Sequence, residues 1–363
     1  MLSPLLVRLS GSPRERGRVH GETLKSVIRG AVERWQARVE NLLAAPFRDY
    51  LSRFPDETRF KEAVRRWTPS LLDEIDGIAE GCGLERDLVF AWQWIDEHVW
   101  LIDRLQREKE RAESSGCSAL GRVWPEENRA LIGQNWDIPA IKEGVQTLLH
   151  ITYPDSDLET LVVTQAGAVG ALGLNNGGTG LLINTLPHLN PSTEGLPVSC
   201  LVRGALEQGS FRESDAFVRN VRHATGQNYL LSSGREMADL ECSGNSVMEF
   251  RLAKRGDRAC HSNHPLVHTD SRQDLLKKLG KDFHSESTRK RFEYLEKRTL
   301  DPDQPWTVEG MKSTLKNPLV CVEPDNSRGI FTAACVIMEL GERPCLHMAP
   351  GPPSMTPFTV YAF

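Results

Sequence analysis

The pattern of apolar and polar positions divides the chain into a helical first third and a longer part that mixes strands with helices. Residues 21–40 and 71–80 carry apolar side chains at helical spacing, and Gly81 and Gly83 end the second of these runs. Beyond residue 117 the apolar positions follow the spacing of strands, with glycines marking the turns between them. These strands are predicted at 130–136, 148–153, 160–165 and 181–186, in a sheet that we expect to be antiparallel.

The rest of the chain adds further helices and strands. Helices are predicted at 198–208, 214–224, 286–297 and 308–316, and strands at 228–232, 247–253, 329–340 and 358–363. Two groups of strands with helices outside them predict a layered α+β sandwich. The periodicity leaves open how the layers stack.

The length of 363 residues exceeds the usual size of a domain, which allows two domains or one large layered domain. The region richest in proline, glycine and serine, 187–197, is short and flanked by apolar segments, which is typical of a loop inside a domain. Hydrophobic residues make up 39% of the chain and permit a large core. We therefore expect a single domain over 1–363.

Charge and cysteine usage bear on the partners and the compartment. A net charge of −5 gives no reason to expect nucleic acid or an anionic membrane as partner. The apolar run at the start is too short for a signal sequence, and no apolar stretch of membrane-spanning length follows. The eight cysteines form no Cys-x-x-Cys pair, which favours a reducing compartment, so we expect a cytoplasmic protein.

Cys117 is the first candidate for chemistry, because it stands where the charged segment 104–113 gives way to strands. A thiolate attacks carbonyls well when its pKa is lowered or a base takes its proton. Gly116 before it permits backbone angles that a side chain would forbid. The alternative is a small buried hydrophobic residue, as most single cysteines are.

Three polar residues lie at strand or loop ends. Asp137 can orient an amine or guanidinium, or it can form a turn before Pro139. The amide of Asn263 can donate to an oxyanion, or it can stabilise a loop. Arg328 enters an apolar strand, where an arginine needs a carboxylate.

Other motifs are interpreted as structural. The group that most resembles a metal site consists of Cys260, His261, His264 and His268. Its spacing matches no established zinc site, and Pro265 breaks the helix that would align the last two histidines, so we predict no metal and no cofactor. The glycine-rich segment 170–180 lacks the lysine of a phosphate loop. We expect the tryptophans at 92, 94 and 100 in the core and the basic run 289–291 on a solvated helix face.

Several motifs occur together in a fixed order. They are Arg16-Gly17-x-x-His20-Gly21, Glu74-x-x-Gly77-Ile78-Ala79-x-Gly81, Gly116-Cys117, Gly133-Gln134-Asn135-Trp136-Asp137, Asn175-x-x-Gly178, Ser262-Asn263-His264 and Ser327-Arg328-Gly329. In this order the chain resembles, over nearly its whole length, the acyl-coenzyme A:6-aminopenicillanic acid acyltransferase (isopenicillin N acyltransferase) family of N-terminal-nucleophile hydrolases. It departs from the family at 118–120, which is less polar than expected, and in the first hundred residues, so the substrate does not transfer.

The resemblance implies a four-layer αββα sandwich with two antiparallel sheets between helices. It also implies self-cleavage between Gly116 and Cys117. The products would be a small, mainly helical chain, 1–116, that lines the pocket and a second chain, 117–363, that begins with the nucleophile. The two fragments would stay together as a heterodimer, and a further oligomer stays open.

The resemblance further implies the roles of the site residues. Cys117 would be the nucleophile, and its new α-amine, which titrates near 7.7–8.0, would accept the thiol proton. Asp137 would hold that amine or pair with Arg328, and Asn263 would stabilise the oxyanion. Supporting positions are implied for Asn135, Trp136, Ser327 and His264.

The resulting prediction is a self-processing cysteine amidase that splits a small N-acyl or aminoacyl amide through a thioester on Cys117. The first alternative is an acyltransferase that passes the acyl group to an amine such as a β-lactam nucleus. The second is an uncleaved, inactive binding protein on the same fold. We favour hydrolysis because water needs no second pocket.

Overall fold

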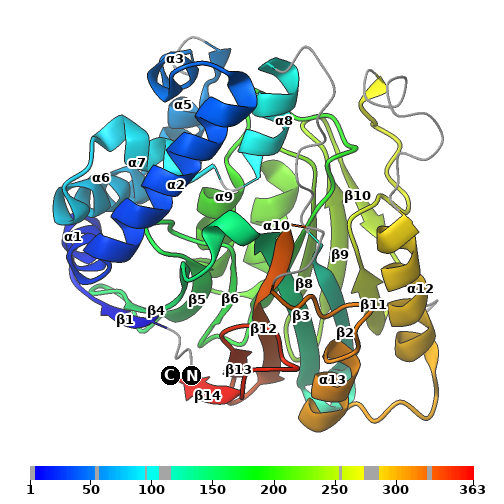
Figure 1. Ribbon diagram of the computed structural model, residues 1–363. Helices are drawn as coiled ribbons and strands as arrows, with labels where there is room; N and C mark the ends of the chain where they lie inside the picture. The colour runs from blue at the N-terminus through cyan, green and yellow to red at the C-terminus, as the bar shows by residue number, and fades with distance from the viewer. Residues whose placement is uncertain are drawn as a thin grey trace.

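Two β-sheets lie face to face between two layers of helices (Figure 1). The structure, a computed structural model, describes residues 5–53, 57–94, 96–105, 116–252, 256–273, 286–324 and 329–363. The predicted α+β class, with two sheets between helices, is confirmed.

The first sheet has eight strands in the order β1-β4-β5-β6-β7-β8-β9-β10. Their bounds are β1 Leu5–Leu9, β4 Gln146–Thr152, β5 Glu159–Gln165, β6 Leu172–Asn175, β7 Gly180–Thr185, β8 Gln227–Ser232, β9 Met237–Cys242 and β10 Val247–Phe250. Neighbouring strands are antiparallel except β1, which runs parallel to β4, so the prediction of antiparallel pairing is wrong at this edge. A parallel pair needs a long crossover, and here α1 to α8 and two strands of the other sheet separate the partners.

The second sheet has six strands in the order β11-β2-β3-β12-β13-β14, all antiparallel. Their bounds are β11 Arg258–His261, β2 Ser118–Trp124, β3 Arg129–Pro139, β12 Ile330–Gly341, β13 Cys345–Ala349 and β14 Thr359–Ala362. The sequence pattern missed β1, β2, β6, β9, β11 and β13. Five of these have only four to six residues, too few for a clear alternation.

The helices of the first third follow β1 and precede all other strands in the chain. They are α1 Pro13–Thr23, α2 Lys25–Leu43, α3 Phe47–Leu51, α5 Phe60–Trp67, α6 Ser70–Cys82, α7 Arg86–Trp92 and α8 Glu97–Leu105. Later helices are α9 Val198–Leu206, α10 Phe211–Asn220, α12 Glu286–Leu300 and α13 Val308–Leu315, with short 3-10 turns η1 Pro125–Glu127 and η2 Ala140–Lys142. Helices α9 and α10 contact the first sheet, whereas α12 and α13 contact the second on the opposite side of the molecule (Figure 1).

The core runs between the sheets and under the first helices. Strand β7 is buried along its whole length, because α9 covers one face and the second sheet the other, and its first four residues are accordingly apolar without alternation. The expectation that the tryptophans at 92, 94 and 100 belong to the core is confirmed. In the described ranges, no helix has the length and apolar character needed to cross a membrane.

One buried glutamine ties the two sheets together. The side-chain amide of Gln134 on β3 donates to the backbone oxygen of Ile183 on β7, and its oxygen accepts from the backbone N–H of Ile183 at 3.1 Å. Both hydrogen-bonding groups of the amide are therefore satisfied inside the core, as buried polar groups require. This pair fixes β3 relative to β7.

The backbones of helices α1 and α6 are in direct contact, which explains the glycines of the motifs that begin at Arg16 and Glu74. A Cβ on Gly17 would lie 1.9 Å from the carbonyl oxygen of Glu74, and one on Gly77 would lie 2.2 Å from that of Arg14. Only glycine allows backbones to approach this closely. These motif positions therefore serve helix packing.

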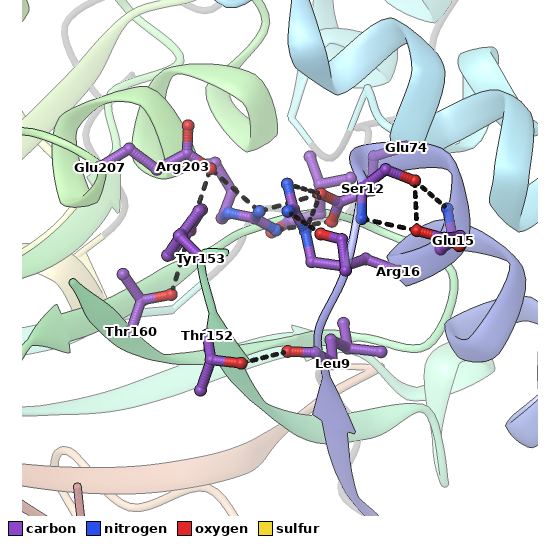
Figure 2. A network of polar contacts seen from close by, with 12 residues as sticks. Leu9, Ser12, Glu15, Arg16, Glu74, Thr152, Tyr153, Thr160, Arg203 and Glu207 are labelled. Atoms are coloured by element: carbon purple, nitrogen blue, oxygen red, sulfur yellow. Dashed lines mark hydrogen bonds and ion pairs between the residues drawn. The ribbon is translucent and has the colours of Figure 1, made fainter. Parts of the chain in front are cut away.

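A buried charge network joins the same helices to α9 (Figure 2). Glu74 accepts hydrogen bonds from Arg16 at 3.2 Å and from both terminal nitrogens of Arg203 at 2.9 and 3.1 Å. Arg203 also donates to Glu207, which accepts from the hydroxyl of Tyr153. Burial favours a higher pKa for Glu74, but the two guanidinium groups outweigh it and hold that pKa below its usual value. Glu74 is therefore a buried carboxylate shared by two arginines.

Candidate active site

Cys117 lies directly before β2 and is 2% exposed. Its Sγ is 3.9 Å from the backbone oxygen of Asp137, to which the thiol donates. Burial raises the pKa of the thiol to about 12, and the negative charge of Asp137 adds to this effect. In this continuous chain the thiol is therefore protonated at neutral pH, and its reaction requires a base.

Gly116 packs against the carboxylate of Asp137. A Cβ on Gly116 would lie 2.7 Å from Oδ2 of Asp137 and 3.0 Å from Cδ1 of Ile330. The φ angle of Gly116 is outside the left-handed range, so the freedom that glycine permits there is not used. Glycine is required here because there is no space for a side chain.

Asp137 is fully buried inside β3, where it pairs with Thr332 of β12. Its Oδ1 accepts a hydrogen bond of 2.6 Å from the Thr332 hydroxyl. The interpretation as a turn residue before Pro139 does not hold, because Asp137 lies within the strand. Its carboxylate lies at the Gly116–Cys117 peptide.

Asn263 follows β11 and is 5% exposed. Its backbone N–H donates to Oγ1 of Thr288 at 2.9 Å, and its Nδ2 donates to the backbone oxygen of Thr185 at 3.0 Å. His264 Nδ1 is within hydrogen-bonding distance of both Ser262 and Thr288. The first turn of α12 therefore holds the segment that carries Asn263.

Arg291 on α12 connects these groups and was missed by the sequence analysis. Its NH2 donates to Oδ1 of Asn263 at 2.9 Å, and its NH1 donates to the backbone oxygens of Gly116 at 2.7 Å and Cys117 at 2.5 Å. NH1 also lies 3.0 Å from the Ser118 hydroxyl.

The expectation that the basic run 289–291 is a solvated face is therefore wrong for its last residue. The first two residues of the run are exposed, but Arg291 is only 4% exposed. It shares one helical face with Thr288, Leu295 and Thr299, which are also buried. This spacing, with Leu295 four residues later, is the signal that could have identified Arg291 as inward-facing.

The remaining predicted residues, the catalytic candidate Arg328 among them, fall into two groups. Asn135 donates from Nδ2 to the backbone oxygens of Leu315 and Val320, both at 2.8 Å, and so holds the end of α13; Trp136 is 2% exposed. Ser327 and Arg328 lie outside the described residues. The described chain resumes at Gly329, whose backbone oxygen accepts from Ala140 N just beyond the end of β3.

A second set of polar groups, with Asp96 buried and Lys142 half-buried, is connected to Asn263 through Thr185. The hydroxyl of Thr185 donates to Asp96 at 3.0 Å, and Asp96 also accepts from Gln227. Burial raises the pKa of Asp96, and burial lowers the pKa of Lys142 on η2 to about 8. Sequence patterns could not reveal this set, because its members come from four separate segments.

The histidine cluster does not converge on one point in the described structure. His261 contacts Glu241 and the backbone oxygen of Ser262, both at 2.9 Å, whereas His268 contacts Ser246. Cys260 belongs to the core beneath α12.

Within the described ranges, the ligand atoms of Glu339, Cys345 and His347 on the β12–β13 hairpin are close enough to share a metal. Nε2 of His347 lies 2.7 Å from Oε1 of Glu339, which is a hydrogen-bonding distance. Two ligand atoms of one tetrahedral zinc ion would lie about 3.4 Å apart. The carboxylate of Glu339 and the imidazole of His347 therefore form a hydrogen bond at the hairpin.

Comparisons with known proteins agree with these motifs. Residues 124–329, more than half of the chain, match the family described as acyl-coenzyme A:6-aminopenicillanic acid acyl-transferase. The chain is 29% identical over 287 residues to the 40 kDa form of the acyl-coenzyme A:6-aminopenicillanic-acid-acyltransferase of Emericella nidulans, covering 75% of this chain and 72% of that protein.

Two solved structures are similar to this chain at lower identity. Penicillin V acylase from Agrobacterium tumefaciens is 12% identical with a TM-score of 0.44, covering 68% of this chain and 86% of that one. The N-acylethanolamine-hydrolyzing acid amidase ortholog of Caenorhabditis elegans is 12% identical with a TM-score of 0.42, covering 61% and 92%. The family assignment rests on the sequence match: this chain belongs to the acyl-coenzyme A:6-aminopenicillanic acid acyltransferase family.

Proposed function

We propose that this chain is a self-processing cysteine amidase that cleaves a small N-acyl or aminoacyl amide through a thioester on Cys117. Membership of the family makes it an enzyme of acyl transfer or amide hydrolysis. The observation that supports the finer assignment is the environment of the Gly116–Cys117 peptide. This peptide is buried between the carboxylate of Asp137 and a guanidinium that also contacts Asn263.

The proposed processing reaction uses the thiol of Cys117 on its own peptide bond. Sγ attacks the carbonyl carbon of Gly116, the C–N bond breaks, and the nitrogen of Cys117 takes a proton and becomes an α-amine. Water then splits the thioester into a carboxylate on Gly116 and the regenerated thiol. The fragments 1–116 and 117–363 are the products.

The proposed turnover reaction repeats this chemistry on a free amide. A free α-amine ordinarily has a pKa near 7.7–8.0, so the α-amine of Cys117 accepts the thiol proton and returns it to the leaving amine. Asp137 orients the amine, and Asn263 donates to the oxyanion. Water releases the acyl group without a second binding pocket, which favours hydrolysis over transfer.

Transfer to an amine is the second candidate, and the name of the Emericella nidulans relative supports it. Acceleration of product formation by added amines, after a burst of the first product, would favour transfer.

The direct test of the proposal is the mass of the purified protein after incubation at neutral pH. We expect two fragments, 1–116 and 117–363. Because the described cysteines are free, no disulfide joins the fragments, and they should stay together under reducing conditions. Amidase activity in a sample that contains only the intact chain of 363 residues would contradict the proposal, because no free α-amine would exist. An intact, inactive chain would favour a binding protein instead.

Replacing Asn263 by alanine tests the proposed oxyanion donor. In processed protein, we expect kcat to fall by about 10²–10³-fold, because one preorganised donor is lost. The exposed Asn245, whose Nδ2 donates to Asp270, provides the control: Asn245→Ala should retain wild-type kcat. An unchanged kcat in a processed Asn263→Ala variant would remove Asn263 from the mechanism.

A further inference from the structure

The side chain of Arg291 contacts both the peptide bond proposed to be cleaved and the proposed oxyanion donor Asn263. Its guanidinium is buried, and NH1 lies 2.7 Å from the carbonyl oxygen of Gly116, at the bond proposed to break. NH2 lies 2.9 Å from Oδ1 of Asn263. A guanidinium stays charged, and its planar donors reach two acceptors at once.

The contact with Gly116 has a direct consequence for cleavage. When Sγ of Cys117 attacks the Gly116 carbon, the carbonyl oxygen becomes an oxyanion. A charged donor that already lies within hydrogen-bonding distance of this oxygen strengthens its contact as the negative charge develops. The surroundings are buried, so water does not weaken the interaction.

The contact with Asn263 orients the amide of that residue. Arginine offers donors and no acceptors, so the oxygen of the Asn263 amide must face Arg291. The Nδ2 group then faces Thr185, to whose backbone oxygen it donates. Without Arg291 the amide loses the partner that fixes this orientation.

We propose that Arg291 stabilises the oxyanion of self-cleavage and afterwards positions Asn263 for turnover, an inference that rests on the proposed function. Cleavage separates the Gly116 carbonyl from Cys117. The contacts of Arg291 with Cys117, Ser118 and Asn263 do not depend on the cleaved bond. One residue therefore acts first on the chain itself and later through Asn263 on the substrate.

The test measures the rate of self-cleavage in Arg291→Ala and Arg291→Lys by intact mass. We expect both to cleave about 10²-fold more slowly than wild type, because the alanine lacks the donor and the lysine presents its donors from a single atom. Arg289→Ala removes the same charge from an exposed position on the same helix and should cleave at the wild-type rate. If Arg291→Ala does not fold, Arg291→Gln replaces it and removes the charge while keeping a polar side chain.

Chemical rescue separates a direct role from a structural one. Guanidinium added to the folded Arg291→Ala chain, below denaturing concentrations, should accelerate cleavage, whereas equal concentrations of sodium chloride should not. Cleavage within about threefold of wild type, well short of the loss expected for a missing oxyanion donor, would overturn the inference. Slow cleavage that guanidinium accelerates no more than sodium chloride would also overturn it. Failure of the wild-type chain to cleave would instead refute the proposed function itself.

Discussion

Replacing Cys117 by alanine is expected to yield an intact chain of 363 residues that neither cleaves itself nor hydrolyses an amide. The alanine has no atom that can attack the Gly116 carbonyl, and no α-amine is released. Intact-mass analysis and an amidase assay on the same sample provide the measurement. Cys200→Ala, which removes another buried thiol, is the control and should retain both reactions. Turnover by Cys117→Ala at the wild-type rate would make Cys117 a structural residue.

Cys117→Ser separates the two reactions that depend on this residue. Its hydroxyl can still attack Gly116, because an attacking group on the adjacent residue gains up to about 7–11 kcal/mol from proximity. A free substrate lacks this covalent tether. We therefore expect the serine variant to lose far more of its hydrolysis than of its cleavage. Equal losses in both reactions would contradict this explanation.

Replacing Glu74 by glutamine is expected to lower the free energy of unfolding by about 3–5 kcal/mol. The change leaves Arg16 and Arg203 buried without the carboxylate that they share (Figure 2). Chemical denaturation followed by tryptophan fluorescence measures the effect. Because the pKa of Glu74 is lowered, the difference from wild type should be complete above about pH 4.3 and decrease as the solution becomes more acidic.

The matched control for this change lies on the same two helices. Glu80 on α6 pairs with Arg14 on α1 at the exposed surface. Exposed ion pairs add little to stability, so Glu80→Gln should leave the free energy of unfolding nearly unchanged. Equal destabilisation by both substitutions would show that burial of the network does not determine its strength.

The sequence by itself identified most longer helices and strands and the residues of the proposed self-cleavage site. Apolar spacing depends on local backbone geometry, so the helix at 286–297 and the strands at 130–136 and 329–340 were found close to their observed bounds. The adjacent residues Gly116 and Cys117 and the pentapeptide 133–137 were also recognised, because a motif of consecutive residues can be read without knowing the fold.

The tertiary structure alone decided which of these residues meet. Asp137 could be a turn residue or a site residue until β3 and β12 placed its carboxylate against Gly116. Arg291 was assigned to the solvent because two exposed basic residues precede it, yet its helical face packs on the second sheet. Contacts between segments separated by 20 to 175 residues depend on how whole layers pack, and local periodicity carries no information about that packing.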